Sequence, residues 1–301
     1  MMATTAGRCA GWVVGLVALL GAGIASAGEL WTENAQEALA QAAKEKKDVL
    51  IDFTGSDWCG WCKKLDAEVF SQPGFQAEAP KYFVFLKLDF PHQRPLSAET
   101  KKQNAEWQQK LAIQGYPTIV LADAAGQPYA KTGHQAGGAE GYLKHLAELR
   151  QLRAKRDDLF AKAQAAQGIE RAKALDQALQ ALDPSFLGCY SDVAQEIVKL
   201  DADGKAGLKV KYEAMLLVQK IGAAMQAQKL DEAIALADEA IKGLNGKGQA
   251  AQDILFMKSF AQFRKQDKAA AKRSLQEAIQ AAPGTPKAAQ IQQILERAFK
   301  E

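Results

Sequence analysis

The fold is decided by the segment Phe53-Thr54-Gly55-Ser56-Asp57-Trp58-Cys59-Gly60-Trp61-Cys62-Lys63-Lys64. An apolar run at residues 49–51 precedes it, and Leu65, Val69 and Phe70 follow at helical spacing. Cys59 and Cys62 therefore stand where a predicted strand ends and a helix begins. The unpaired N–H groups and the dipole of a helix N-terminus stabilise a thiolate at Cys59. Cys62 follows nearly one turn later, within reach of a disulfide, so the segment predicts thiol–disulfide chemistry.

Two motifs resemble a known family. The run Trp-Cys-Gly-x-Cys-Lys at residues 58–63 resembles the active site of thioredoxin and protein disulfide isomerase, and residues 55–62 are most similar to thioredoxin-like proteins that bacteria export. The run Gly-Tyr-Pro-Thr at residues 115–118 matches the position of the cis-proline that faces the cysteines in that family. The resemblance covers about residues 31–149. It implies an α/β thioredoxin-like fold, with a central mixed sheet flanked by helices.

The resemblance also assigns expected roles. It implies that Cys59 is the nucleophile and that Cys62 resolves the mixed disulfide, with Trp58 covering the site. A cis Pro117 would present the backbone of Tyr116 to an extended substrate segment. We count Gly60 and Trp61, the two residues between the cysteines, among those that contact the substrate.

Asp52 is the one acidic residue in the apolar strand predicted at residues 49–53. Burying a carboxylate is costly unless it has a task. In thioredoxins a buried aspartate behind the second cysteine assists proton transfer, and Asp52 stands close to that place, one residue further from Cys59 than in thioredoxin itself. The alternative is an aspartate at a strand end that caps a loop.

Other uses of the cysteines are weaker alternatives. A structural zinc site needs four ligands, and the remaining candidates, Cys189, His92, His134 and His145, show no paired spacing. We therefore expect no metal site and no bound cofactor. Copper(I) binding by the Cys59–Cys62 pair is a further, smaller alternative. Cys189 is interpreted as an inert buried thiol, with a regulatory or intermolecular role as the alternative.

Composition gives the broad class of the chain. It has 301 residues, of which 48% are hydrophobic and 24% charged, long enough for two globular domains. The formal net charge is +3, and basic residues alternate with acidic ones. This balance does not call for nucleic acid or an anionic membrane as a partner.

The first 27 residues predict a signal peptide. Arg8 precedes an apolar run at residues 12–24, and Ala25-Ser26-Ala27 fits a cleavage site. The run is short of the ~20 residues that span a bilayer, so an uncleaved anchor is the lesser alternative. We expect a periplasmic or secreted mature chain that meets a membrane only through this transient segment.

Hydrophobic periodicity and turn residues predict the remaining elements of a thioredoxin fold. The predicted helices are residues 34–46, 58–70, 97–114 and 139–149, and the predicted strands are residues 49–53, 82–89, 118–122 and 128–132. Residues 133–138 are glycine-rich but lack the spacing of a phosphate loop, and they are interpreted as a flexible connector. The thioredoxin-like domain is expected over residues 28–150.

Residues 151–301 predict an all-helical domain. Ala, Gln, Lys, Glu and Leu dominate, and residues 231–241 resemble residues 269–279. Both runs resemble the second helix of a tetratricopeptide repeat, with residues 172–184 as a weaker third copy. Stacked helical hairpins leave a concave surface that often binds peptides or proteins.

The leading hypothesis is an exported thiol–disulfide oxidoreductase that exchanges disulfides with protein substrates. Reductase or interchange activity with an external electron donor is favoured over oxidation. The alternative is a redox-regulated or inert thioredoxin-fold module whose helical half holds a partner protein.

Overall fold

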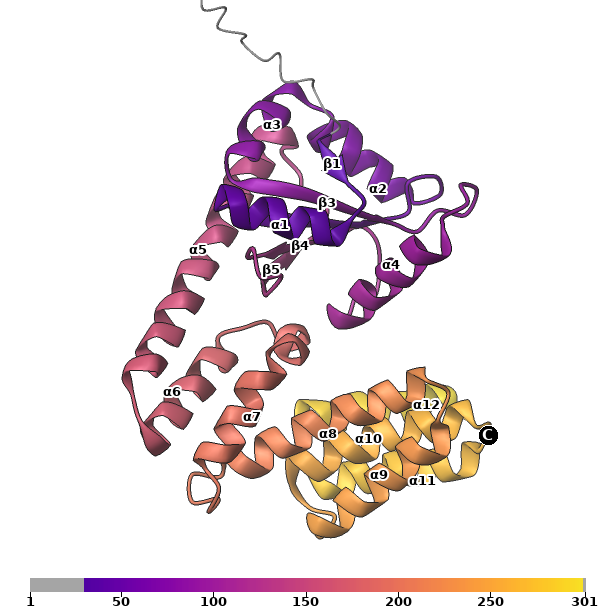
Figure 1. Ribbon diagram of the computed structural model, residues 1–301. Helices are drawn as coiled ribbons and strands as arrows, with labels where there is room; N and C mark the ends of the chain where they lie inside the picture. Colours follow the sequence, from indigo (N-terminus) through magenta and orange to yellow (C-terminus); the bar gives the residue numbers. More distant parts are fainter. Residues whose placement is uncertain (1–29, 300–301) are drawn as a thin grey trace, which may run out of the picture. The chain divides into compact units, whose positions relative to one another are not determined.

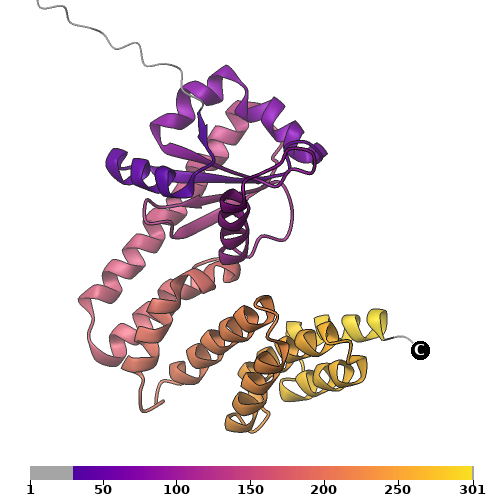
Figure 2. The same cartoon turned by 45° about the vertical axis from the view of Figure 1, so that its right-hand side comes forward.

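The computed structural model describes residues 30–299 (Figures 1 and 2). The signal peptide expected at residues 1–27 lies outside these residues. Within them, no helix is both long and apolar enough to span a membrane.

A five-stranded mixed sheet carries the first half of the chain, in the order β1-β3-β2-β4-β5. The central strand β2 (Asp48–Thr54) pairs in parallel with β3 (Phe83–Asp89) and in antiparallel with β4 (Thr118–Ala122). At the edges, β1 (Trp31–Thr32) pairs with β3, and β5 (Pro128–Thr132) pairs with β4. Every residue of β2 is buried, as expected for an apolar strand covered on both faces.

Helices cover both faces of the sheet (Figure 1). On one face, the alanines of α1 (Ala35–Glu45) join Val49, Ile51 and Phe53 of β2 in one apolar core. The other face carries a cluster of four aromatic rings from the helices after the cysteines, from β3 and from α5. Phe75 contacts the other three, which are Phe70, Phe85 and Tyr142. The remaining helices of this half are α2 (Gly60–Leu65), a π-helical segment (Asp66–Phe70), α3 (Pro73–Glu78), a 3₁₀ turn (Ala79–Lys81) and α4 (Ala98–Lys110).

The predicted thioredoxin fold is confirmed, but three predicted helices had wrong boundaries. The helix predicted at residues 97–114 is α4, which ends at Lys110 because Ala112 adopts a positive φ. The helix predicted at residues 58–70 begins at Gly60 and changes to π-helical geometry at Asp66. The helix predicted at residues 139–149 is α5 (Gly138–Ala165), which continues without interruption past residue 150. Residues 150–165 contain neither proline nor glycine, so nothing in this stretch stops the helix.

The predicted helical second half is also confirmed. It consists of α6 (Gly168–Gln180), a 3₁₀ helix (Pro184–Tyr190), α7 (Ser191–Leu200), α8 (Leu208–Gln226), α9 (Leu230–Gly243), α10 (Gly248–Arg264), α11 (Lys268–Ala281) and α12 (Pro286–Ala298). The two similar sequence runs are α9 and α11, which pack on α8 and α10 respectively. Their identity as tetratricopeptide repeats stays a prediction.

A buried arginine ties α5 to the turn between β4 and β5. Arg156 donates to the Asp123 carboxylate at 2.7 Å and to the backbone oxygen of Gln127 at 3.2 Å. It also donates to the hydroxyl of Tyr190, which in turn donates to the backbone oxygen of Pro128. One guanidinium therefore joins the sheet to the 3₁₀ helix that ends at Tyr190.

Replacing this guanidinium should be strongly destabilising. We expect Arg156→Ala to lower the free energy of unfolding by about 3 kcal/mol, because it leaves the largely buried carboxylate of Asp123 without its cationic partner. The control is Lys162→Ala, which removes an exposed ion pair with Asp158 on the same helix and should cost less than about 0.5 kcal/mol. Urea unfolding measures both, and equal losses would contradict this account.

Candidate active site

Four loops meet at the sheet edge where β2 ends. The loop after β3 starts at this edge because β3 runs parallel to β2. β4 begins there, with Thr118 opposite Phe53, and β5 ends there, with Thr132 opposite Ile119. Residues 55–59, 90–97, 111–117 and 133–137 therefore converge.

Cys59 and Cys62 form a disulfide at the start of α2, and their Cα atoms are 5.2 Å apart. Cys59 is the N-cap residue, and its Sγ accepts a hydrogen bond from the backbone N–H of Cys62 at 3.2 Å. Both cysteines are buried. Because the helix starts at Gly60 rather than at residue 58, the sulfur of Cys59 lies on the cap itself, where helix N–H groups and the dipole favour a thiolate.

Trp58 covers the segment that leads to the cysteines. Its indole lies over Gly55, where an added Cβ would stand 2.4 Å from an indole carbon. The indole N–H donates to the backbone oxygen of Phe90 at 2.8 Å, and the ring stacks on His92 with 4.6 Å between centroids. Trp58 therefore ties the cysteine segment to the loop after β3.

Two carboxylates also hold the cysteine segment to the loop after β3, and the sequence analysis missed both. Asp57 accepts hydrogen bonds from the backbone N–H groups of His92 and Gln93, at 3.0 and 2.6 Å. These bonds hold the pKa of Asp57 below its usual range. The buried Asp89 accepts from the backbone and hydroxyl of Ser56 and from Arg94. In the sequence, the only indication of this loop is the polar character of residues 89–94, Asp-Phe-Pro-His-Gln-Arg.

The residues around the cysteines point in different directions. Gly60 has open space where a side chain would lie. Lys63 donates to the backbone oxygen of Asp57 at 2.7 Å and so adds positive charge beside the cap. Trp61 is 59% exposed and lies against His134, which comes from the glycine-rich loop after β5.

The Tyr116–Pro117 peptide bond is cis, and it lies between α4 and β4. The Tyr116 ring packs edge-on against Trp58, with 5.8 Å between centroids. Its hydroxyl accepts a hydrogen bond from Gln108 at 2.6 Å. The structure thus places Trp58 in contact with the segment that the resemblance assigned to substrate docking.

Asp52 lies inside β2 rather than at its end, which argues against the loop-capping alternative. It is buried, and within residues 30–299 its Oδ1 has no hydrogen-bond partner. Burial raises the pKa of Asp52 to about 7; the positive charge of Lys87 opposes this rise, and the charges of Asp66 and Asp89 add to it. Lys87 stands opposite Asp52 on β3, and the sequence analysis missed it because the pairing joins separate strands.

Cys189 lies away from this edge. Its thiol is partly buried and donates to the backbone oxygen of Lys110 at 3.2 Å, and burial raises its pKa. A raised pKa makes a thiol less reactive. Among the described residues, no group of three or more His, Cys, Asp or Glu side chains is arranged to hold a metal ion.

Comparison with known proteins agrees with this geometry. Residues 35–148 match the model of a thioredoxin-like domain. Disulfide bond reductase DsbH of Chlamydia pneumoniae is 31% identical over 130 residues, which cover 43% of this chain and 78% of that protein. Thiol:disulfide interchange protein DsbD of Vibrio vulnificus (strain CMCP6) is 32% identical over 120 residues, which cover 39% of this chain but only 18% of that protein. A solved structure of a DsbH oxidoreductase aligns with 40% of this chain and 83% of its own, at 29% identity and a TM-score of 0.38.

The raised pKa of Asp52 predicts how stability depends on pH. Between pH 4 and 7 this carboxyl is protonated in the folded protein and ionised in the unfolded one. The free energy of unfolding should therefore fall as pH rises through this window, by at most about 1.4 kcal/mol per pH unit, and level off above it. Asp52→Asn removes the effect, so the variant should gain stability over the original protein between pH 4 and 7.

Urea unfolding of the oxidised protein at several pH values measures this difference. Leu50→Val, a change in the same buried strand that removes no titratable group, is the control and should differ from the original protein by the same amount at every pH. A pH-independent difference for Asp52→Asn would contradict the raised pKa.

Proposed function

Because the chain belongs to the thioredoxin-like family, we propose that it is an exported thiol–disulfide oxidoreductase acting on proteins through Cys59 and Cys62. The observation that carries the proposal is a disulfide at a helix N-terminus, at the sheet edge where the cis-proline segment also lies. We assign the thioredoxin-like part to residues 28–150 and the helical part to residues 151–301.

The reaction begins with the reduced pair. The Cys59 thiolate attacks one sulfur of a substrate disulfide; a Cys59–substrate bond forms, the substrate S–S bond breaks, and the departing thiolate takes up a proton. Cys62 then loses its proton and attacks Sγ of Cys59, which releases the second substrate thiol. The substrate gains two electrons and two protons, and the Cys59–Cys62 disulfide is restored.

Asp52 is the proposed acceptor of the Cys62 proton. A group whose pKa lies near the working pH can both take and return a proton, and burial brings the pKa of Asp52 to about 7. Lys87 on the neighbouring strand stabilises the ionised form and so keeps this pKa from rising further.

Substrate contacts are proposed for the residues that surround the pair. Trp58 and Trp61 offer exposed aromatic surface, 42% and 59% exposed respectively, and Gly60 leaves room between them. The backbone of Tyr116, ahead of Pro117, would pair with an extended substrate segment as an added strand does.

We propose that the enzyme works as a reductase or in disulfide interchange. One relative is described as a disulfide bond reductase and another as a thiol:disulfide interchange protein. Each turnover oxidises the Cys59–Cys62 pair, so an external donor must return two electrons. We propose the periplasm or another exported compartment as the location, in line with the expected signal peptide.

Single cysteine variants test this assignment in the reduction of insulin disulfides. Cys59→Ser should abolish turnover because no nucleophile remains. Cys62→Ser should also stop turnover and accumulate a mixed disulfide between Cys59 and the substrate, visible by non-reducing electrophoresis. Cys189→Ser serves as the background and the control and should keep its activity. A Cys62→Ser protein that captures no substrate would contradict the assigned roles.

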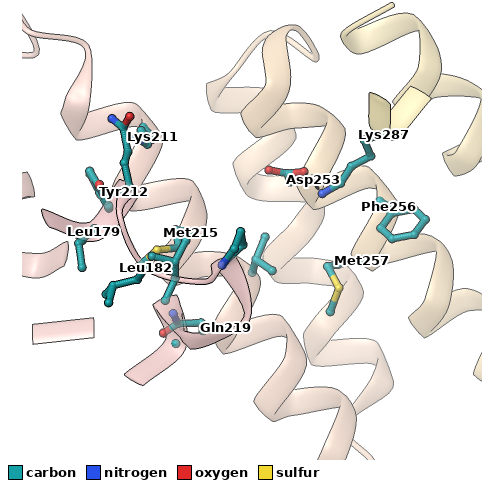
Figure 3. A pocket seen from close by; sticks show the side chains of 15 residues that line it. Leu179, Leu182, Lys211, Tyr212, Met215, Gln219, Asp253, Phe256, Met257 and Lys287 are labelled. Atoms are coloured by element: carbon teal, nitrogen blue, oxygen red, sulfur yellow. Dashed lines mark hydrogen bonds and ion pairs between the residues drawn. The ribbon is translucent and has the colours of Figure 1, made fainter. Parts of the chain in front are cut away.

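A groove in the helical half favours the second candidate function, the holding of a partner protein. The groove has a volume of about 630 Å³, and it is lined by 15 residues, which are Leu182 and residues of α6, the 3₁₀ helix, α8, α10 and α12. Figure 3 shows Met215 and Met257 facing this space from opposite sides. Methionine side chains adapt to varied apolar partners, so we propose that the groove holds an apolar segment of a protein substrate.

A charge placed in the groove tests this second function. Met215→Glu should raise the KM for insulin relative to the KM for glutathione disulfide by roughly tenfold, the effect of about 1.4 kcal/mol of lost binding. Val210→Glu is the control, since Val210 is an exposed apolar residue of α8 that does not line the groove. Equal KM ratios in both variants, with equal thermal stability, would contradict a role for the groove in substrate binding.

A further inference from the structure

Two tryptophans beside the cysteines contact loops that follow strands on opposite sides of β2. Trp58 contacts the loop after β3, and Trp61 contacts the loop after β5. In the strand order, β3 lies on one side of β2 and β5 on the other. The Cys59–Cys62 pair at the end of β2 therefore has an exposed indole on each side. Exposed apolar surface of this kind commonly marks a binding site.

Trp61 takes part in a closed set of contacts. Its ring lies 5.2 Å from the ring of His134, and Nζ of Lys64 lies 5.0 Å from its centroid. The Nε2 atom of His134 lies 2.9 Å from Oε2 of Glu68, and Lys64 lies 3.8 Å from the same carboxylate. Glu68 thus links the two side chains that contact the indole, which restricts where the indole can move.

His134 is itself firmly placed. Its side chain is only 15% exposed. The backbone oxygen of Gly133, the preceding residue, accepts a hydrogen bond from the Tyr142 hydroxyl at 3.2 Å. A side chain on Gly133 would come within 3.2 Å of the backbone oxygen of Pro117. The segment predicted as a flexible connector, residues 133–138, is therefore anchored to α5 at its start, where it lies against the cis-proline segment.

We propose that His134 and Glu68 are positioning residues that hold Trp61 as one of two exposed aromatic side chains that flank the cysteine pair. Trp58 is the other. The two indoles select protein disulfides in which an apolar or aromatic side chain adjoins the reacting cysteine. The inference rests on the proposed function, and it adds the substrate class and two residues to which no role has been assigned.

The chemistry of the two indoles explains the preference. Aromatic rings pack well against other rings and against aliphatic side chains, so a substrate side chain that packs against the exposed surface of these indoles is removed from water. A glycine at the same substrate position leaves the indoles solvated. An indole that is already fixed loses less conformational freedom when the substrate binds. His134 therefore strengthens binding through Trp61, although it does not contact the substrate itself.

Two peptides measure the selection. Each contains one cysteine in disulfide linkage to glutathione, and they differ only in carrying tryptophan or glycine next to that cysteine. The readout is the ratio of their kcat/KM values for reduction by the reduced protein. A change in folding or in the reactivity of Cys59 alters both values together and leaves the ratio unchanged.

The original protein should favour the tryptophan peptide. Trp61→Ala should lower the ratio by roughly tenfold, mainly through the KM of the tryptophan peptide. His134→Ala and Glu68→Ala should produce most of that loss, and adding His134→Ala to Trp61→Ala should produce no further loss. Glu68→Gln, which still offers an oxygen to His134, should restore most of the ratio. Gln135→Ala, in the same loop and without a contact to Trp61 among those described, is the matched control.

Four outcomes would overturn the inference. If His134→Ala leaves the ratio of the two kcat/KM values unchanged, Trp61 needs no support from His134. This holds even if both kcat/KM values fall together. A further loss in the double variant would mean that His134 acts separately from Trp61. If the original protein reduces both peptides equally, the two indoles do not select, although the proposed function stands. If it reduces neither peptide nor insulin, the proposed function fails and the inference with it.

Discussion

The pairing of β2 with β3 and β4 is the constraint on which the rest of the structure depends. All seven residues of β2 are buried, so a shift of one residue in register would exchange its two faces. That register brings Phe53 opposite Thr118 and Asp52 opposite Lys87. It thereby sets the cis-proline segment beside the cysteines and a cation beside the buried carboxylate.

Local signals were sufficient to predict the strands and the cysteine pair. The apolar run at residues 49–51 and the change to helical spacing after Lys64 depend only on neighbours in the chain. These local signals, together with the resemblance, predicted the fold class and the candidate cysteines. They did not predict where α5 ends, because this helix crosses from one half of the chain into the other and is held there by Arg156.

The parts of the site that could not be predicted are pairs made across long separations. Asp57 binds the backbone at His92, and Glu68 binds His134, 66 residues away. Each partner taken alone is an ordinary polar loop or helix residue, and only the sheet order makes them neighbours. The sequence therefore identified the cysteine pair, whereas the residues that support it emerged only from the fold.

The same sheet order separates two tasks at one edge. In the proposed function, the chemistry depends on groups at the end of β2 and within it, where Cys59 caps a helix and Asp52 lies buried with a raised pKa. Contacts with a substrate are proposed for Trp58 and Trp61, which loops from either side hold in place. Because these loops contact the indoles rather than the sulfur atoms, substitutions in them can alter which disulfides are bound with little effect on how the pair reacts. A central strand that is buried on both faces makes this separation possible, since it holds the reacting atoms fixed while the loops around them vary.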